Sequence, residues 1–171
     1  MLGLMQDWPL LLHRVIDHAA TNHAERPVVT RSVEGPITTT TYAAIHARAL
    51  RLAKRLDREG VALGDRIATL AWNTARHIEC WYGITGAGAI YHTVNPRLFP
   101  DQIVWIMNHA EDCLAMVDLT FVPLLEKLAD KLPKIERYGS SPVCGHSQRL
   151  REANRFPARH SLSPPSAALC S

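Results

Sequence analysis

The chain has 171 residues, 47% of them hydrophobic, which suits one soluble domain with a sizeable core. Its formal net charge of +3 comes entirely from residues 139–171, so residues 1–138 are neutral and do not favour a nucleic acid partner. No apolar run approaches the roughly 18–20 residues that cross a membrane, so no membrane span is expected.

The N-terminal region predicts a helix followed by a hairpin. Asp7 is a candidate cap for a helix with Pro9 in its first turn, and the apolar side chains that follow recur at helical spacing. Two β-rich runs, residues 28–32 and 37–41, flank a turn that contains Gly35 and therefore predict a β-hairpin. Neither element carries a candidate for chemistry.

Residues 1–12 are apolar, but they lack the basic start and the small-residue cleavage site of a secretory signal, which favours a cytoplasmic location. The four cysteines are widely spaced and form no Cys-x-x-Cys pair, so free thiols are expected rather than disulfides or a zinc site. The nine histidines are scattered, and none is a candidate catalytic residue. The sequence thus predicts a cytoplasmic protein without a metal site.

Residues 42–59 predict a long amphipathic helix that begins at the N-cap Thr41 and ends before Gly60. Its apolar stripe consists of Ile45, Ala49, Leu52, Ala53 and Leu56. The opposite side carries Arg48, Arg51, Lys54, Arg55 and Arg58. We interpret this basic side as a solvated face rather than a nucleic acid contact, because cations near a helix C-terminus are favourable and acidic neighbours partly offset them.

The next segment predicts a strand, a helix and a second strand. Residues 67–72 are a short apolar run after a Gly-Asp turn, Asn73 is a candidate helix cap, and residues 75–87 have helical periodicity. Residues 89–94 are β-rich and stop before Pro96, which lacks a ladder donor. Such a βαβ unit predicts a parallel sheet with both faces covered.

Gly83, Gly86 and Gly88, near the end of this helix, allow two interpretations. A phosphate-binding loop would need its glycines after a strand and at the start of a helix. Here they end a helix before a strand, so close helix–sheet packing and helix termination are the favoured interpretation.

Helices and strands continue to alternate further along the chain. Pro100 and Asp101 predict the start of another helix, and residues 113–117 are a continuous apolar run typical of a buried strand. Residues 121–132 have helical spacing, and residues 135–138 predict the start of another strand. The expected fold class is therefore α/β, with a partial doubly wound, mostly parallel sheet, flanking helices and an N-terminal hairpin.

Residues 139–171 break this pattern. They contain seven serines, four prolines and no β-branched run. This composition favours a disordered C-terminal tail.

Three runs carry a family resemblance: residues 64–73 (GDRIATLAWN), 92–98 (HTVNPRL) and 108–112 (NHAED). They resemble the acyl-adenylate-forming, AMP-dependent synthetase/ligase family, and most of all its fatty-acid–CoA ligases, which include ligases for methylthio-propionate-like acids. The resemblance implies that residues 1–138 are the N-terminal part of an AMP-binding (adenylation) domain. Residues 139–171 are unlike the family, and we hypothesise a reading-frame shift or truncation near residue 138, which translation of the other frames of the gene would test.

The resemblance implies ATP-dependent activation of a medium- or long-chain fatty acid, or of a methylthio-propionate-like carboxylate, to an acyl-AMP and then to an acyl-CoA. The full-length family uses ATP, Mg²⁺ and CoA. Its phosphate-binding loop and its late catalytic lysine have no counterpart in this sequence. We therefore expect a truncated acyl-CoA synthetase without catalytic residues, which binds none of these cofactors tightly and does not catalyse the reaction alone.

Two alternatives stay open. The first is a non-catalytic interaction or dimerisation module, because in the family an N-terminal arm can take part in a homodimer. The second is a stand-alone mononucleotide-binding domain, which would need a phosphate loop after the first strand of the βαβ unit. Residues 73–75 (NTA) are a poor loop of this kind.

The candidate site consists of His92, Thr93, Asn95 and Arg97. These residues lie at the C-terminal end of a predicted parallel strand, where open α/β sheets bind ligands. Because a guanidinium suits bidentate contact with a phosphate, Asn95 and Arg97 are predicted beside the CoA and substrate channel, with Arg97 near a CoA phosphate. The alternative is that Asn95 and Pro96 shape the turn and that Arg97 caps local carbonyl groups.

Overall fold

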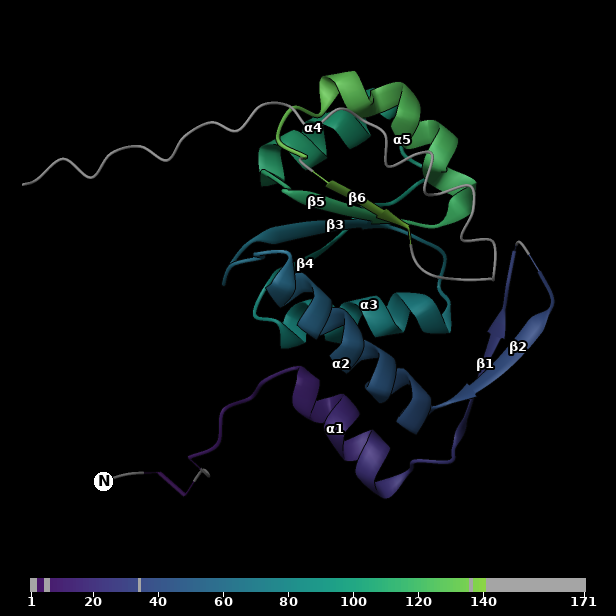
Figure 1. The fold of residues 1–171 in the computed structure, drawn as a ribbon, viewed down its shortest axis with the longest axis vertical. Coiled ribbons are helices and arrows are strands. Elements are labelled where there is room, and N and C mark those ends of the chain that lie inside the picture. Colours follow the sequence, from purple (N-terminus) through teal and green to yellow (C-terminus); the bar gives the residue numbers. More distant parts are fainter. Residues whose placement is uncertain (1–2, 5–6, 34, 136, 141–171) are drawn as a thin grey trace, which may run out of the picture.

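The computed structural model describes residues 3–4, 7–33, 35–135 and 137–140. Helices lie on both sides of a parallel sheet (Figure 1), so the predicted α/β fold class is confirmed. The helices are α1 (His13–Asn22), α2 (Tyr42–Arg58), α3 (Ala75–Gly86), α4 (Pro100–Ala110) and α5 (Val122–Leu128), with the 3₁₀ turns η1 (Leu119–Phe121) and η2 (Ala129–Lys131). The strands are β1 (Pro27–Arg31), β2 (Ile37–Thr41), β3 (Arg66–Leu70), β4 (Ile90–Thr93), β5 (Leu114–Val117) and β6 (Arg137–Ser140).

The main sheet has its strands in the order β4-β3-β5-β6, and all of its pairs are parallel. The register places Ala68 of β3 beside His92 of β4 and Ala115 of β5. From β3 the chain passes through α3 to β4, which lies on one side of β3. From β5 the chain passes through α5 to β6, which lies on the side of β5 away from β3. The direction of winding therefore reverses between β3 and β5, which is the topological switch point of a doubly wound sheet.

Two hydrophobic clusters cover the two faces of the sheet. Alternate side chains of a strand point to opposite faces, and here each set meets its own pair of helices (Figure 1). On the α4–α5 side the cluster includes Ala68, Leu70, Ala115, Val117, Ile103, Met107 and Leu125. On the α2–α3 side it includes Ile67, Leu114, Met116, Leu56, Cys80 and Ile84. Both faces are buried, as the βαβ pattern predicts.

Helices α2 and α3 approach each other closely at Gly83. A Cβ atom built on this residue would lie 2.8 Å from Cδ2 of Leu52 and 3.0 Å from the carbonyl oxygen of Ala49. The glycine is therefore required by close packing, as predicted, but its neighbour is helix α2 rather than the sheet. Gly88 follows the end of α3 with a φ angle of +81°, a conformation that suits glycine and ends the helix.

The predicted helix caps hold for α2 and shift by one residue for α3. The Thr41 hydroxyl accepts a hydrogen bond from the Ala44 N–H at 3.3 Å, as expected. At α3 the cap is Thr74 and not Asn73, because the Thr74 hydroxyl accepts from the His77 N–H at 3.4 Å. Both residue types cap helices well, so the choice depends on where the chain turns after β3 rather than on propensity.

Helix α1 begins at His13, so the prediction that Asp7 and Pro9 start this helix is wrong. Ile16 is its one buried residue, while Leu12 and Val15 remain half exposed. A short helix depends on tertiary packing for most of its stability. Residues 7–12 have no such packing, and the helix begins only where the chain meets α2 and α3.

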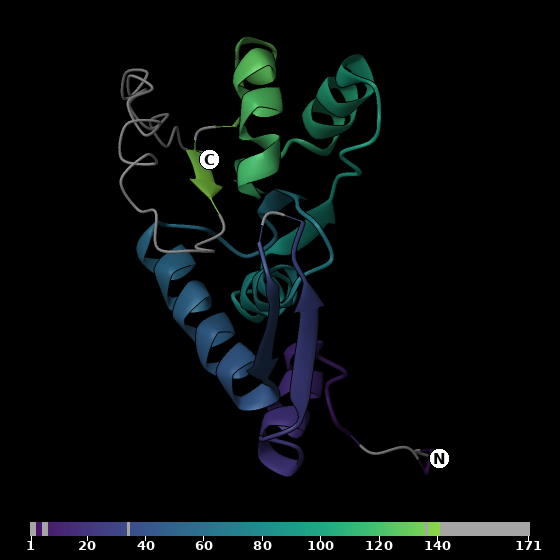
Figure 2. The ribbon, with the colours of Figure 1, turned by 90° about the vertical axis from the view of Figure 1, so that its right-hand side faces the viewer.

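Strands β1 and β2 form the predicted antiparallel hairpin, with Pro27 opposite Thr41 and Arg31 opposite Ile37. Figure 2 shows the hairpin beside α2 and α3. It also holds α3 in place, because the buried Thr30 hydroxyl accepts a hydrogen bond from the Ala75 N–H at 3.1 Å.

Strand β6 runs through Ser140, two residues past the boundary expected at residue 138. The rest of the predicted disordered tail lies outside the described residues, so the division of the chain at residue 138 stays a prediction. Among the helices that the structure describes, none has the length and apolar character needed to cross a bilayer.

Candidate functional site

At the switch point, contacts at the carboxyl edge of the sheet join the ends of β3 and β5. Asp118, at the end of β5, is buried, and its Oδ2 accepts a hydrogen bond from the Trp72 N–H at 2.7 Å. Its own N–H donates to the carbonyl oxygen of Leu70 at 3.0 Å. The Trp72 ring lies 5.0 Å from the ring of Phe121. These contacts join the ends of β3 and β5 at the switch point, the position where a doubly wound sheet most often holds a ligand.

The start of α3 is where a phosphate would meet free N–H groups if this were a mononucleotide-binding domain. Two of its first-turn donors already have partners, since the Ala75 N–H donates to Thr30 and the His77 N–H donates to Thr74. In the part of the chain that the structure describes, no group of three or more His, Cys, Asp or Glu residues could hold a metal ion. The phosphate-loop alternative would therefore need N–H donors at the start of α3 that already have partners within the chain.

The structure divides the four candidate residues rather than bringing them together. The Nδ1 atom of His92 lies 2.8 Å from Oδ2 and 3.0 Å from Oδ1 of Asp112, which is in the connection between α4 and β5. Asp112 is fully buried, and burial raises the pKa of its carboxyl group, although the hydrogen bond from His92 opposes this shift. Thr93, the next residue in β4, is exposed. His92 is therefore a structural partner of Asp112.

Asn95 and Arg97 follow β4 at the same edge of the sheet. The Asn95 side-chain oxygen accepts a hydrogen bond from the Arg97 N–H at 3.0 Å, which makes an Asx turn around Pro96. The turn-shaping role considered as the alternative for Asn95 is thus present. The Arg97 side chain is exposed beside this turn, and its contact with CoA stays a prediction.

A partly buried polar cluster under α3 was not predicted. The Nε2 atom of His77 lies 3.2 Å from the Thr69 hydroxyl and also contacts the Tyr91 hydroxyl. Burial lowers the pKa of His77, and burial raises the pKa of Tyr91 to about 12, so both side chains stay neutral near pH 7. The three residues come from β3, α3 and β4, and no local spacing in the sequence links them.

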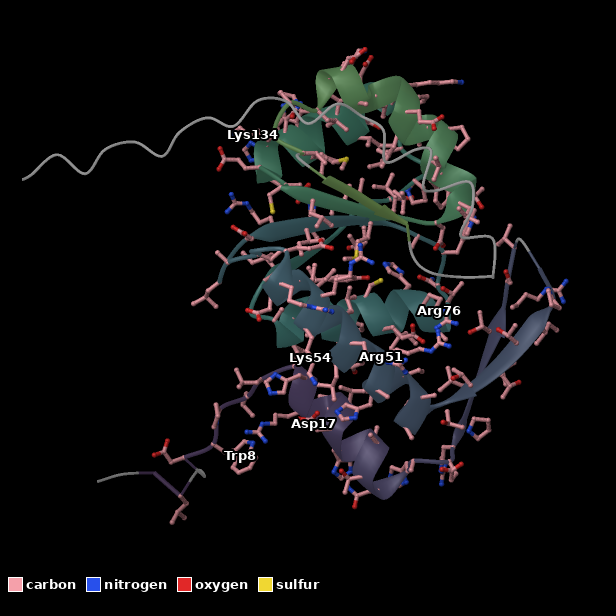
Figure 3. The ribbon with its side chains drawn as sticks, viewed as in Figure 1. Trp8, Asp17, Arg51, Lys54, Arg76 and Lys134 are labelled. Carbon is pink, nitrogen blue, oxygen red and sulfur yellow. The ribbon has the colours of Figure 1, made fainter. Side chains whose placement is uncertain are left out.

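Glu79, two residues after His77, has separate partners, as the i, i+2 spacing predicts. Its carboxylate accepts two hydrogen bonds from Arg76, at 2.9 and 2.8 Å, and lies 3.8 Å from Nε of Arg48. Burial raises the pKa of Glu79, and Arg76 partly opposes this effect. Arg76 projects from α3 toward the basic side of α2 (Figure 3), so this buried acid links the two helices.

Comparison with known proteins gives a consistent result. A family model described as AMP-binding enzyme matches residues 16–166. The chain is 48% identical over 137 residues to the 3-methylmercaptopropionyl-CoA ligase of Ruegeria pomeroyi, a match that covers 80% of this chain and 25% of that protein. It is 40% identical over 138 residues to the medium-chain-fatty-acid–CoA ligase of Ectopseudomonas oleovorans, which covers 81% of this chain and 25% of that protein. The chain thus spans about a quarter of the length of these relatives.

The fold also matches a solved structure, the N-terminal domain of FACL13 from Mycobacterium tuberculosis. The TM-score is 0.70, the sequence identity is 21%, and the match covers 95% of this chain and 39% of that one. At this identity the likeness concerns the fold alone.

The cluster under α3 predicts how stability changes with pH. Because burial keeps His77 neutral in the folded chain, while the unfolded chain binds a proton near pH 6.5, the native chain loses stability as the pH falls below about 6.5. His77→Gln removes this titration. The stability cost of the substitution, measured by urea unfolding, is expected to be larger at about pH 7.5 than at about pH 5.5. A cost that is the same at both pH values would contradict the assignment.

Proposed function

Because this chain belongs to the AMP-binding enzyme family, we propose that residues 1–138 are the N-terminal part of the adenylation domain of an acyl-CoA ligase. The identity that this part shares with two CoA ligases over nearly its whole length carries the proposal. The doubly wound sheet agrees with it, because such a sheet supplies a rigid edge beside which a ligand site can be built.

The reaction proposed for the whole ligase joins a carboxylic acid to CoA at the expense of ATP. The acid first becomes an acyl-AMP, with pyrophosphate as the leaving group, and the acyl group then passes to the CoA thiol. The relatives' names point to a methylthio-propionate-like acid or a medium- or long-chain fatty acid as the substrate class. ATP, Mg²⁺ and CoA are the cofactors of this proposal, and the cytoplasm is its location.

The part described here is proposed to act as a scaffold rather than as a catalyst. Loss of pyrophosphate needs preorganised donors and a metal ion around the phosphates. In the first turn of α3, the N–H groups of His77 and Ala75 donate to the hydroxyl groups of Thr74 and Thr30. The Asp118 carboxylate accepts a hydrogen bond from the backbone N–H of Trp72, in the loop after β3. Chemistry at the phosphates therefore depends on residues outside this set.

The 171-residue chain is expected to release no pyrophosphate when mixed with ATP, Mg²⁺ and octanoate or 3-methylmercaptopropionate. The physical reason is that, among the residues that the structure describes, the N–H groups of Ala75 and His77 are already paired and no cluster of three metal ligands is found. A coupled pyrophosphate assay measures this, with the Ruegeria pomeroyi ligase as the positive control under the same conditions. Release of pyrophosphate that depends on the added acid would refute the scaffold proposal.

Asn95 and Arg97 are proposed to lie beside the CoA and substrate channel of the whole enzyme. The Asx turn fixes the backbone at Arg97, and the exposed guanidinium is available to an anionic group at the carboxyl edge of β4.

Replacing the matching arginine by alanine in a full-length relative, the equivalent of Arg97→Ala, is expected to raise the KM for CoA by at least about tenfold, since a hydrogen bond to a charged group contributes about 1.5–3 kcal/mol. The KM for ATP should change little. The equivalent of Lys127→Ala, an exposed change on α5, serves as the control. An unchanged KM for CoA would remove the proposed contact.

The alternative role, a dimerisation module, is favoured by the segment before α1. Residues 7–12 extend away from the helices (Figures 1 and 2), and their apolar side chains are about half exposed or more, with Trp8 56% and Leu10 92% exposed. An apolar arm of this kind would be covered in a homodimer. Sedimentation velocity over a range of concentrations tests this proposal. The intact chain is expected to form a dimer, and removal of residues 1–12 is expected to convert it to a monomer. A chain that stays monomeric throughout would exclude the arm-mediated dimer.

A further inference from the structure

Strand β4 forms one edge of the main sheet. It pairs with β3 on one side, and within the described part of the chain no strand pairs with its other side. The N–H groups of Ile90 and Val94 donate to backbone carbonyl groups of the β3 segment at 2.7 and 2.9 Å, so alternate residues of β4 face β3. Tyr91 and Thr93 therefore direct their backbone N–H and C=O groups away from the sheet. Such outward-facing groups can pair with another strand.

The sequence of β4 lacks the usual protection of an exposed edge. Natural proteins commonly guard such an edge with charged side chains, above all lysine, or with proline. Strand β4 contains no lysine, arginine, aspartate or glutamate and no proline. Ile90, at its start, is 50% exposed, and Thr93, at its end, is exposed as well. The composition of this edge is thus typical of a strand that is covered by a partner.

A stack of aromatic rings lies beside this edge. The Trp81 ring of α3 lies 6.0 Å from the ring of Tyr91, with 17° between the two planes. On α3 itself, the Trp81 ring lies 5.5 Å from the ring of Tyr82, at 11°. Trp81 is 40% exposed although it is held by both neighbours. A rigid, half-exposed tryptophan is the kind of side chain that contributes most to protein–protein interfaces.

A second copy of the chain has the groups that this edge requires. Two identical strands related by a two-fold axis run antiparallel, so the outward-facing groups of each copy meet the same groups of the other. With the axis at His92, Tyr91 of each copy lies opposite Thr93 of the other, which gives about four backbone hydrogen bonds. The lack of acidic and basic side chains in β4 also matters, because an edge with one sign of charge would repel its own copy.

We propose that β4 pairs antiparallel with β4 of a second copy, which joins the two four-stranded sheets into one continuous sheet. The same axis brings the two α3 helices side by side, so the exposed part of each Trp81 ring is covered by the other copy. This inference goes beyond the proposed ligase function and does not depend on it. It competes with the arm of residues 7–12 as the contact that holds a dimer together.

Amide hydrogen exchange of the 171-residue chain, measured over a range of concentrations, tests the proposal. The amides of Tyr91 and Thr93 should exchange more slowly as the concentration rises, because they are paired only in the dimer. Sedimentation velocity should show a dimer over the same range. Exchange at these two amides that does not depend on concentration would overturn the proposal. In a monomer it would leave the edge to another segment, and in a dimer it would place the contact elsewhere, such as in the arm.

A matched pair of lysine variants locates the contact on β4. Thr93→Lys brings two like charges together across the two-fold axis and should weaken dimerisation at least about tenfold. Thr39→Lys makes the same change at an exposed position of β2, in the hairpin, and should dimerise like the unaltered chain. Circular dichroism checks that both variants fold. Equal dimerisation by the two variants would show that the edge of β4 is not the contact.

A second matched pair tests the aromatic part of the interface. Trp81→Ala removes the ring that the second copy covers and should weaken dimerisation by about tenfold or more. Trp105→Ala removes a tryptophan that is 64% exposed on α4, across the sheet, and should leave dimerisation unchanged. A larger loss of dimer with Trp105→Ala than with Trp81→Ala would overturn the proposed arrangement of the two α3 helices.

Discussion

The burial of β3 on both faces is the constraint on which the rest of the structure depends. Ile67, Ala68, Thr69 and Leu70 are each at most 1% exposed. Burying the larger apolar side chains of such a strand contributes about 1.5–3 kcal/mol each, but only if helices cover both sides of the sheet. Helices α2 and α3 cover one side and α4 and α5 cover the other, and the connections needed to reach both sides produce the reversal of winding between β3 and β5.

Features that depend on neighbours along the chain could be predicted from the sequence. The cap at Thr41, the buried stripe of α2 and the apolar run of β5 each follow from spacing or from one side chain next to its own backbone. Features that depend on tertiary contacts could not be predicted. The start of α1 at His13 depends on where packing begins, and the neighbour of Gly83 depends on how α2 crosses α3.

The candidate site illustrates the same limit. The loop at Asn95 could be predicted, because Asn-Pro has a strong local preference, and the Asx turn is present. The partner of His92 lies 20 residues further along, and it becomes apparent only when the register of β4 and the course of the chain after α4 are known. The cluster of Thr69, His77 and Tyr91 likewise needs three elements to be placed first. Proximity in sequence groups His92 with Arg97, but it does not reveal that Asp112 is the hydrogen-bond partner of His92.

The contact at Gly83 has a mechanical consequence. With no side chain at this position, the backbone of α3 lies directly against Leu52 of α2, and any larger residue would push the two helices apart. Such a displacement would also strain the hydrogen bonds of His77, which attach α3 to the strands beneath it. The spacing of two helices and the polar contacts beneath them thus depend on a residue that has no side chain of its own.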